Sequence, residues 1–328
     1  TTHTHTERER HIRMTICLII LTLNLFELID GRSIDLESHV NPKEVKYFEK
    51  KLDSRIGYWS PSTSSIDWCE RNYVVTSYIA EFWNCISSFS MCLLGLILFI
   101  RGFRNRIEKR FLLSSIGLTI VGLGSAYFHG TLTYFGQMAD ELPMVYSMII
   151  WWFILFQMNE INRNQSLTYK WILFGLAYAL LWTYVHTLKS FVIIFQGHMS
   201  LMVLGAIIKF ISLYRQSIHC VRQLKYLLIV YISLLAIAFI CWIIDQQLCD
   251  KFNRLSRINP QLHAWWHVLG AIHCHLGIVI SELMRFISIQ SQQKTNNFKP
   301  NDHVHLLFYF GLPFVNYHHQ QQKQQKQK

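Results

Sequence analysis

Charged residues are scarce in this 328-residue sequence: Asp, Glu, Lys and Arg make up 16% of it, against 51% hydrophobic residues. Average soluble proteins contain roughly 25% charged residues, so the composition argues against a soluble globular domain and against a disordered chain. Only 15 Gly and 6 Pro are present, too few for a fibrous or low-complexity protein. Acidic residues number 20 against 31 basic ones, an excess that could serve nucleic acid, an anionic membrane surface or membrane topology.

The hydrophobic residues gather in seven windows without Asp, Glu, Lys or Arg. Each window is close to the roughly 17 to 25 residues that cross a hydrocarbon core, and each is apolar nearly all round, as lipid-facing helices must be. We therefore expect an all-α polytopic membrane protein, a bundle of seven transmembrane helices. The windows are 82–100, 111–128, 142–158, 171–188, 190–208, 226–244 and 262–281.

Basic residues concentrate in alternate connections between these windows. The first, third and fifth connections hold eleven Lys and Arg residues, and the second, fourth and sixth hold four. Because cytosolic loops collect Lys and Arg, we expect a lumenal or exterior N-terminus and a cytosolic C-terminus. Much of the net charge of +11 is then a topology signal. We expect no nucleic-acid partner, and no obligate protein partner can be inferred.

Two terminal segments lie outside the windows. A polar leader, 1–13, precedes Met14 and the apolar run 15–26, which fits a signal peptide; an eighth span and a non-native leader are the alternatives. The tail is rich in Gln and Lys and is expected to be solvated and disordered. The expected organisation is a leader and lumenal segment at 1–56, a seven-helix domain at 57–288 and a cytosolic tail at 289–328.

Histidines in the predicted spans are candidate functional residues, because ionisable groups inside a membrane are costly. Ser125 and His129 are four residues apart, as are His263 and His267, so each pair shares a helix face. Two His at this spacing can bind one zinc ion, and His129 would be the third ligand. The predicted topology puts all three imidazoles on the lumenal side.

Asp140 lies just before the third window, in the short connection that follows His129. It is therefore expected on the same side of the membrane as His129. Ser125 would lie one helical turn deeper than His129, about 6 Å. A three-histidine zinc site with an adjacent carboxylate and hydroxyl is typical of a hydrolase.

Oxygen-bearing side chains also cluster just before the first window, at Asp67, Glu70, Asn72 and Glu81. Calcium prefers such hard oxygen ligands. The spacing does not match an EF-hand loop, and a solvated acidic turn or a helix cap is the alternative interpretation.

These motifs together resemble the alkaline ceramidases, seven-span zinc amidohydrolases of a superfamily that includes the adiponectin-type receptors. The matching stretches lie between about residues 57 and 310 and include 67–73, 78–84, 124–129, 140–144 and 263–267. The resemblance implies zinc on the three histidines and catalytic roles for Ser125 and Asp140. It also implies calcium near five residues, with the tryptophan contributing its backbone carbonyl: Asp67, Trp68, Glu70, Asn72 and Glu81.

The implied activity is zinc-dependent cleavage of ceramide to sphingosine and free fatty acid, within a membrane of the endoplasmic reticulum or Golgi. Asp140 would move the water proton to the leaving amine, and Ser125 and zinc would stabilise the oxyanion. Two alternatives stay open: hydrolysis of another N-acyl lipid, and a seven-span lipid receptor without turnover.

Eight cysteines are present, without a CxxC pair. Four of them lie in the predicted spans, whereas the topology puts Cys69 and Cys249 in the oxidising lumen. We predict a disulfide between them, which the resemblance supports; two free thiols are the alternative.

Overall fold

A computed structural model describes residues 56–160, 165–188, 192–217, 222–255, 259–292, 306–309 and 312–315. The predicted leader, its apolar run and most of the tail lie outside these residues. Within them the chain forms seven helices and one two-stranded sheet. The elements are α3 (Phe82–Arg104), α4 (Lys109–Thr131), α5 (Tyr134–Phe156), α6 (Gln165–Thr187), α7 (Val192–Ser217), α8 (Arg222–Leu255), α9 (Leu262–Gln292), β1 (Leu306–Tyr309) and β2 (Leu312–Val315).

Six of these helices are long and apolar enough to cross a membrane: α3, α4, α5 and the segments Ile194–Gln216, Leu224–Cys249 and Leu262–Ile289 of α7, α8 and α9. The prediction of a helical integral membrane protein is confirmed at this level. α6 has 23 residues, as many as α3, but it is not among the six.

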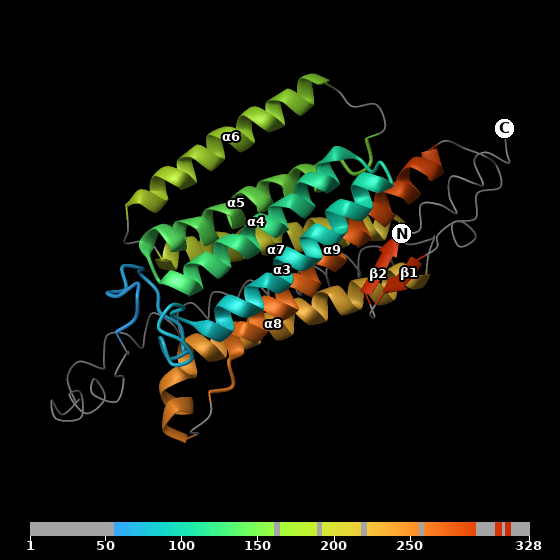
Figure 1. The fold of residues 1–328 in the computed structure, drawn as a ribbon. Coiled ribbons are helices and arrows are strands. Elements are labelled where there is room, and N and C mark those ends of the chain that lie inside the picture. Colours follow the sequence, from blue (N-terminus) through green and yellow to red (C-terminus); the bar gives the residue numbers. More distant parts are fainter. Residues whose placement is uncertain are drawn as a thin grey trace, which may run out of the picture. The chain divides into compact units, whose positions relative to one another are not determined.

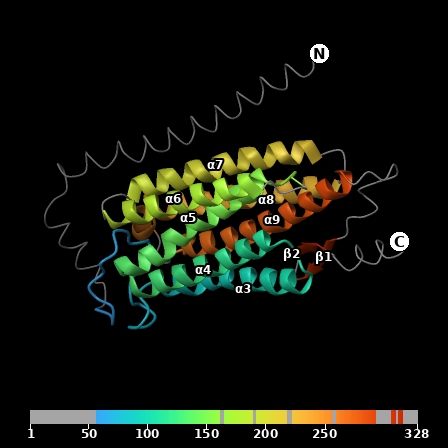
Figure 2. The same cartoon turned by 90° about the horizontal axis from the view of Figure 1, so that it is seen from above.

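α9 is the central helix of the bundle. In its most apolar 18-residue window 78% of the residues are buried, against 17% in α7 and in α8. Figures 1 and 2 show α3 and α8 running beside α9, and Figure 1 shows α6 on the outer side of α5. The helices that carry the candidate residues, α4 and α9, therefore lie where the bundle shields them best.

Helix α4 packs closely against α3 at Gly122. A Cβ atom at this position would lie 2.7 Å from the backbone nitrogen of Cys92. Small residues of this kind let two helix backbones approach in a membrane, where tight packing replaces the hydrophobic driving force. The position of α4, and of His129 at its end, is thus fixed against α3.

The helices of the bundle begin and end at two opposite ends of the molecule. We call the end at which α3, α5 and α9 begin the proximal end, and the opposite end the distal end. Basic residues gather at the distal end, where Arg101 and Arg104 close α3 and Lys109 and Arg110 open α4. Glu108 pairs there with Arg110 at 2.9 Å and also with Arg285 at 2.8 Å.

The start of α5 differs from the prediction. The helix begins at Tyr134 rather than at residue 142. Leu132 takes a left-handed backbone conformation that ends α4, and the Thr133 side chain accepts a hydrogen bond from the Gly136 N–H, as an N-cap residue does. Asp140 therefore lies inside a helix rather than in a connection leading to it.

Part of the tail is folded, which corrects the expectation of a wholly solvated segment. β1 and β2 form an antiparallel hairpin, and Phe314 and Val315 are buried in the main hydrophobic core. Nε2 of His275, on α9, donates to the Pro313 carbonyl at 3.1 Å. The expectation was based on the high content of Gln and Lys in the tail. It did not take account of two short apolar runs, which form this hairpin and pack against α9.

Candidate metal centre

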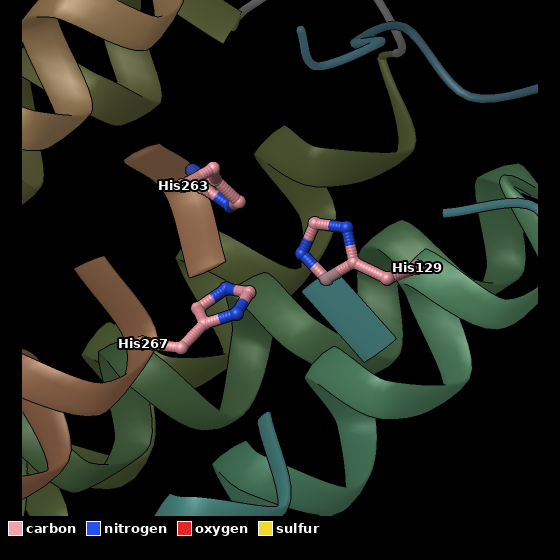
Figure 3. A group of neighbouring side chains, drawn as sticks. All are labelled: His129, His263 and His267. Carbon is pink, nitrogen blue, oxygen red and sulfur yellow. The ribbon is translucent and has the colours of Figure 1, made fainter. Parts of the chain in front are cut away.

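Three histidines meet at the proximal end of the bundle. His129 comes from the last turn of α4, and His263 and His267 come from the start of α9; Figure 3 shows the three rings around a common centre. Their candidate ligand nitrogens all lie within 4.8 Å of one another, and none of the three residues is more than 4% exposed. No second group of three His, Cys, Asp or Glu side chains converges in this way in the described part of the chain.

The donor set of this histidine triad fits a zinc ion. Nε2 of His129 and Nδ1 of His263 are buried and have no hydrogen-bond partner. Such atoms are unfavourable unless something binds them. Imidazole nitrogens are common ligands of zinc, and three of them leave one tetrahedral position open. The residues present are therefore those that a catalytic zinc site requires.

Glu81 orients His129. Its Oε2 lies 2.5 Å from Nδ1 of His129, and the backbone N–H of Glu81 donates to the His129 carbonyl at 2.9 Å. A carboxylate that accepts the Nδ1 proton leaves the Nε2 lone pair available. Carboxylates hold metal-binding histidines in this way in many proteins.

His267 is oriented by the backbone of α3. Its Nδ1 lies 3.1 Å from the Asn84 carbonyl and 2.9 Å from Oγ of Ser87. Because a carbonyl can only accept, Nδ1 carries the proton and Nε2 holds the lone pair. Two of the three imidazoles are thus in the form that can bind a metal through Nε2.

Ser125 is in direct reach of the triad. Its Oγ is 3.4 Å from Nε2 of His267 and is hydrogen-bonded to Oγ of Ser88 at 3.0 Å. The residue is 1% exposed. The structure therefore places a buried hydroxyl beside the three imidazoles.

Asp140 is brought to this region by a close contact between α4 and α5. A Cβ at Gly124 would lie 1.9 Å from the Ala139 carbonyl oxygen, so the two backbones touch here. Pro143, inside α5, has no N–H to bond that carbonyl, which leaves it free to face Gly124. The turn that bears Asp140 lies against the turn that bears Ser125, and Asp140 is half-buried.

The predicted calcium ligands make other contacts. Glu70 accepts the backbone N–H groups of Trp83 at 2.7 Å and Asn84 at 2.8 Å, which caps the start of α3. Glu81 turns toward His129, and Asn72 donates to Asp67 at 3.1 Å. Burial raises the pKa of Glu70 to about 7. Glu70 therefore acts as a helix cap, which was the alternative interpretation of this residue from the sequence.

The family resemblance implies a calcium contact for the Trp68 backbone carbonyl, and the structure shows a further contact made by its ring. The indole stacks on His263, with ring centroids 3.6 Å apart and an interplanar angle of 19°. Next in sequence, Cys69 forms a disulfide with Cys249 of α8, the pair proposed from the sequence. The segment before α3 is thereby tied to α8 beside the triad.

Asp245 was missed by the sequence analysis. Its Oδ1 accepts the His263 N–H at 3.2 Å and its Oδ2 accepts the Cys69 N–H at 3.1 Å. The predicted window ended at residue 244, one residue earlier. A carboxylate inside a long apolar helix was the available signal.

A family model described as Ceramidase matches residues 60–313, which is more than half of the chain. The chain belongs to the ceramidase family. Among its relatives, "Alkaline ceramidase 3" of Mus musculus is 34% identical over 247 residues, covering 73% of this chain and 91% of the relative. "Alkaline ceramidase" of Arabidopsis thaliana is 35% identical over 224 residues, covering 68% and 84%.

The ceramidase match extends past the predicted domain boundary at residue 288. It ends at residue 313, inside β2. The next residue of this strand, Phe314, is 4% exposed. The region matched by the ceramidase family therefore includes most of the hairpin that packs on α9.

Proposed function

We propose that this ceramidase-family protein is a zinc-dependent intramembrane hydrolase that cleaves ceramide to sphingosine and a free fatty acid. Relatives that are 34% and 35% identical to it over the aligned residues bear the name alkaline ceramidase. The observation that carries the proposal is a buried triad of histidines with a serine hydroxyl 3.4 Å from one ring.

His129, His263 and His267 would hold the zinc ion. When bound, zinc supplies Lewis acidity, which makes water nucleophilic near neutral pH and polarises a carbonyl oxygen. Asp140 would accept the proton of the attacking water and deliver it to the nitrogen of the leaving sphingosine. Ser125 would donate a hydrogen bond to the amide oxygen as negative charge develops there.

We propose that α6 is the seventh membrane span. Its two ends contact the two ends of α5: the Tyr134 hydroxyl donates to the His186 carbonyl, and the rings of Phe156 and Trp171 lie 4.5 Å apart. α5 is itself long and apolar enough to cross a membrane. A helix that runs beside it from end to end covers the same thickness.

The proximal end would face the lumen and the distal end the cytosol, in the endoplasmic reticulum or Golgi. Arg101, Arg104, Lys109 and Arg110 lie at the distal end, in keeping with the cytosolic excess of basic residues. The Cys69–Cys249 disulfide suits an oxidising compartment at the proximal end. Ceramide would then enter sideways from the bilayer while water arrives from the lumen.

We also propose that calcium binds the segment before α3, through Asp67, the Trp68 carbonyl, Glu70, Asn72 and Glu81. Glu81 and Glu70 are buried carboxyl groups whose charges a divalent cation would offset. Since Glu81 also bonds His129, calcium would stabilise the wall of the zinc site without touching the amide.

The experiment measures sphingosine release by purified protein supplied with long-chain ceramide. A zinc chelator or His263→Ala is expected to abolish release. His273→Gln is the matched control, since His273 lies on the same helix, outside the triad, where its Nδ1 bonds the Tyr231 carbonyl; this variant should keep its zinc and its activity.

Two outcomes would contradict the proposal. Stoichiometric binding of zinc and lipid without turnover would exclude catalysis and favour a receptor. Release of fatty acid from another N-acyl lipid, with ceramide left intact, would keep the hydrolase and replace the substrate.

A further inference from the structure

Asp245 binds two backbone amides that lie far apart in the sequence. Oδ1 accepts the N–H of His263 at 3.2 Å and Oδ2 accepts the N–H of Cys69 at 3.1 Å. The residue lies in α8, ten residues before the end of the helix at Leu255, and is 4% exposed. One carboxylate therefore joins α8, the start of α9 and the segment before α3.

Both contacts of Asp245 act on His263. One holds the His263 backbone directly. The other holds Cys69, and the preceding residue, Trp68, stacks its ring on the His263 imidazole at 3.6 Å. Asp245 thus acts on the backbone of His263 directly and on its ring through Cys69 and Trp68. The other two histidines are oriented by Glu81 and by the Asn84 carbonyl.

The disulfide does not make Asp245 redundant. Cys249 follows Asp245 by one helical turn on the same face of α8, and its bond to Cys69 fixes a side chain. It leaves the His263 N–H, near the start of α9, without an acceptor. Asp245 supplies that acceptor and thereby connects the disulfide-bonded segment to the helix that carries two of the three histidines.

The chemistry of the two contacts requires a carboxylate. An asparagine side chain has one acceptor oxygen and one NH₂ group, so it could accept only one of the two N–H groups and would oppose the other. Burying a carboxylate is unfavourable, and none of the salt bridges among the described residues involves Asp245. A buried acid whose two oxygens each accept a backbone N–H, one of them that of a candidate metal ligand, points to a positioning role.

We propose that Asp245 is a positioning residue for His263: it sets the place and the ring orientation of that histidine so that the triad binds its metal tightly. The proposal rests on the proposed zinc site. It predicts that loss of the second acceptor oxygen loosens His263 while the helices stay folded.

The test is Asp245→Asn in the purified full-length protein, with metal binding as the readout. Zinc affinity, measured by competition with a chromogenic chelator, is expected to fall roughly 10- to 100-fold, as when other groups that orient metal ligands are changed. In the cobalt-substituted protein the visible spectrum, which reports the ligand geometry, should change. kcat should fall at a nearly constant KM, because Asp245 is buried with both oxygens bonded to backbone amides and is proposed to act through His263.

Leu283→Val is the matched control. Leu283 is buried on α9 in the main core, away from the triad, so this variant should lose thermal stability without a change in zinc affinity or in the cobalt spectrum. If Asp245→Asn does not fold, Trp68→Leu removes the stacking on His263 and should weaken zinc binding in the same direction.

The outcomes separate the two proposals. An Asp245→Asn protein that binds zinc as tightly as wild type, with an unchanged cobalt spectrum, would overturn the positioning role and leave the proposed function standing. A Trp68→Leu protein with unchanged zinc affinity would overturn it when the first variant is unfolded. Wild-type protein that binds no zinc would overturn the metal site itself.

Discussion

Glu81 and His129 are linked twice, through the 2.5 Å contact between Oε2 and Nδ1 and through the 2.9 Å hydrogen bond from the Glu81 N–H to the His129 carbonyl. The two residues are 48 positions apart, one before α3 and the other at the end of α4. The double link makes the start of α3 part of the wall of the candidate zinc site.

Replacing Glu81 with Gln should weaken zinc binding roughly 10- to 100-fold. Glutamine keeps an acceptor oxygen but loses the charge that favours the Nδ1 proton of His129. Chelator competition on the purified variant measures the effect. His273→Gln, whose side chain bonds the Tyr231 carbonyl outside the triad, is the control and should bind zinc normally; equal losses in the two variants would refute a specific role of Glu81 toward His129.

Ser125→Ala should lower kcat by about 10²- to 10³-fold, the usual cost of removing one hydrogen-bond donor to an oxyanion. The zinc content should stay at the wild-type level, because the hydroxyl neighbours His267 and is not one of the three ligands. Activity and metal analysis on the same preparation check this. A variant that loses its zinc along with its activity would show that Ser125 is structural.

Asp140→Asn should reduce kcat by about 10²- to 10⁴-fold, the range for a lost general acid or base. Asparagine fits the same turn of α5, so the fold and the zinc content should persist. The measurement is ceramide turnover together with thermal unfolding. Near-normal turnover in a folded protein would assign the proton transfer to another group.

Calcium binding should weaken as the pH falls below about 7. Burial raises the pKa of Glu70 and Glu81 from 4.5 to about 7, and calcium requires both in the charged form. Without calcium, the folded state takes up protons that the unfolded chain does not hold, so stability falls as the pH rises between these two values. Calcium should therefore raise the unfolding temperature more at about pH 8 than at about pH 6. Equal calcium-induced shifts at the two pH values would contradict the site.

The sequence predicted the helices and the pairing of His263 with His267 because both depend on local spacing, whereas His129 was added from the predicted topology and the family resemblance. Long apolar windows define spans, and a four-residue spacing puts His263 and His267 on one face of α9. The start of α5 was missed because it depends on the left-handed turn at Leu132 and on the cap by Thr133, which the apolar pattern does not report.

The contacts of the candidate site were harder to predict, since they join segments far apart in the chain. The sequence indicated that Glu81 is a calcium ligand together with Asp67. The folded structure shows that Glu81 also contacts His129. Asp245 lies 176 residues from Cys69, so no local pattern could pair them. The strands β1 and β2 were not predicted, because they lie in a tail whose composition is dominated by Gln and Lys.

The most direct test of the zinc hydrolase is to return zinc to metal-free protein while following sphingosine release from ceramide. We predict that activity is absent without zinc and rises to a plateau at one zinc per chain, and that His263→Ala stays inactive at every zinc concentration. Full activity in protein shown to be free of zinc would contradict the account.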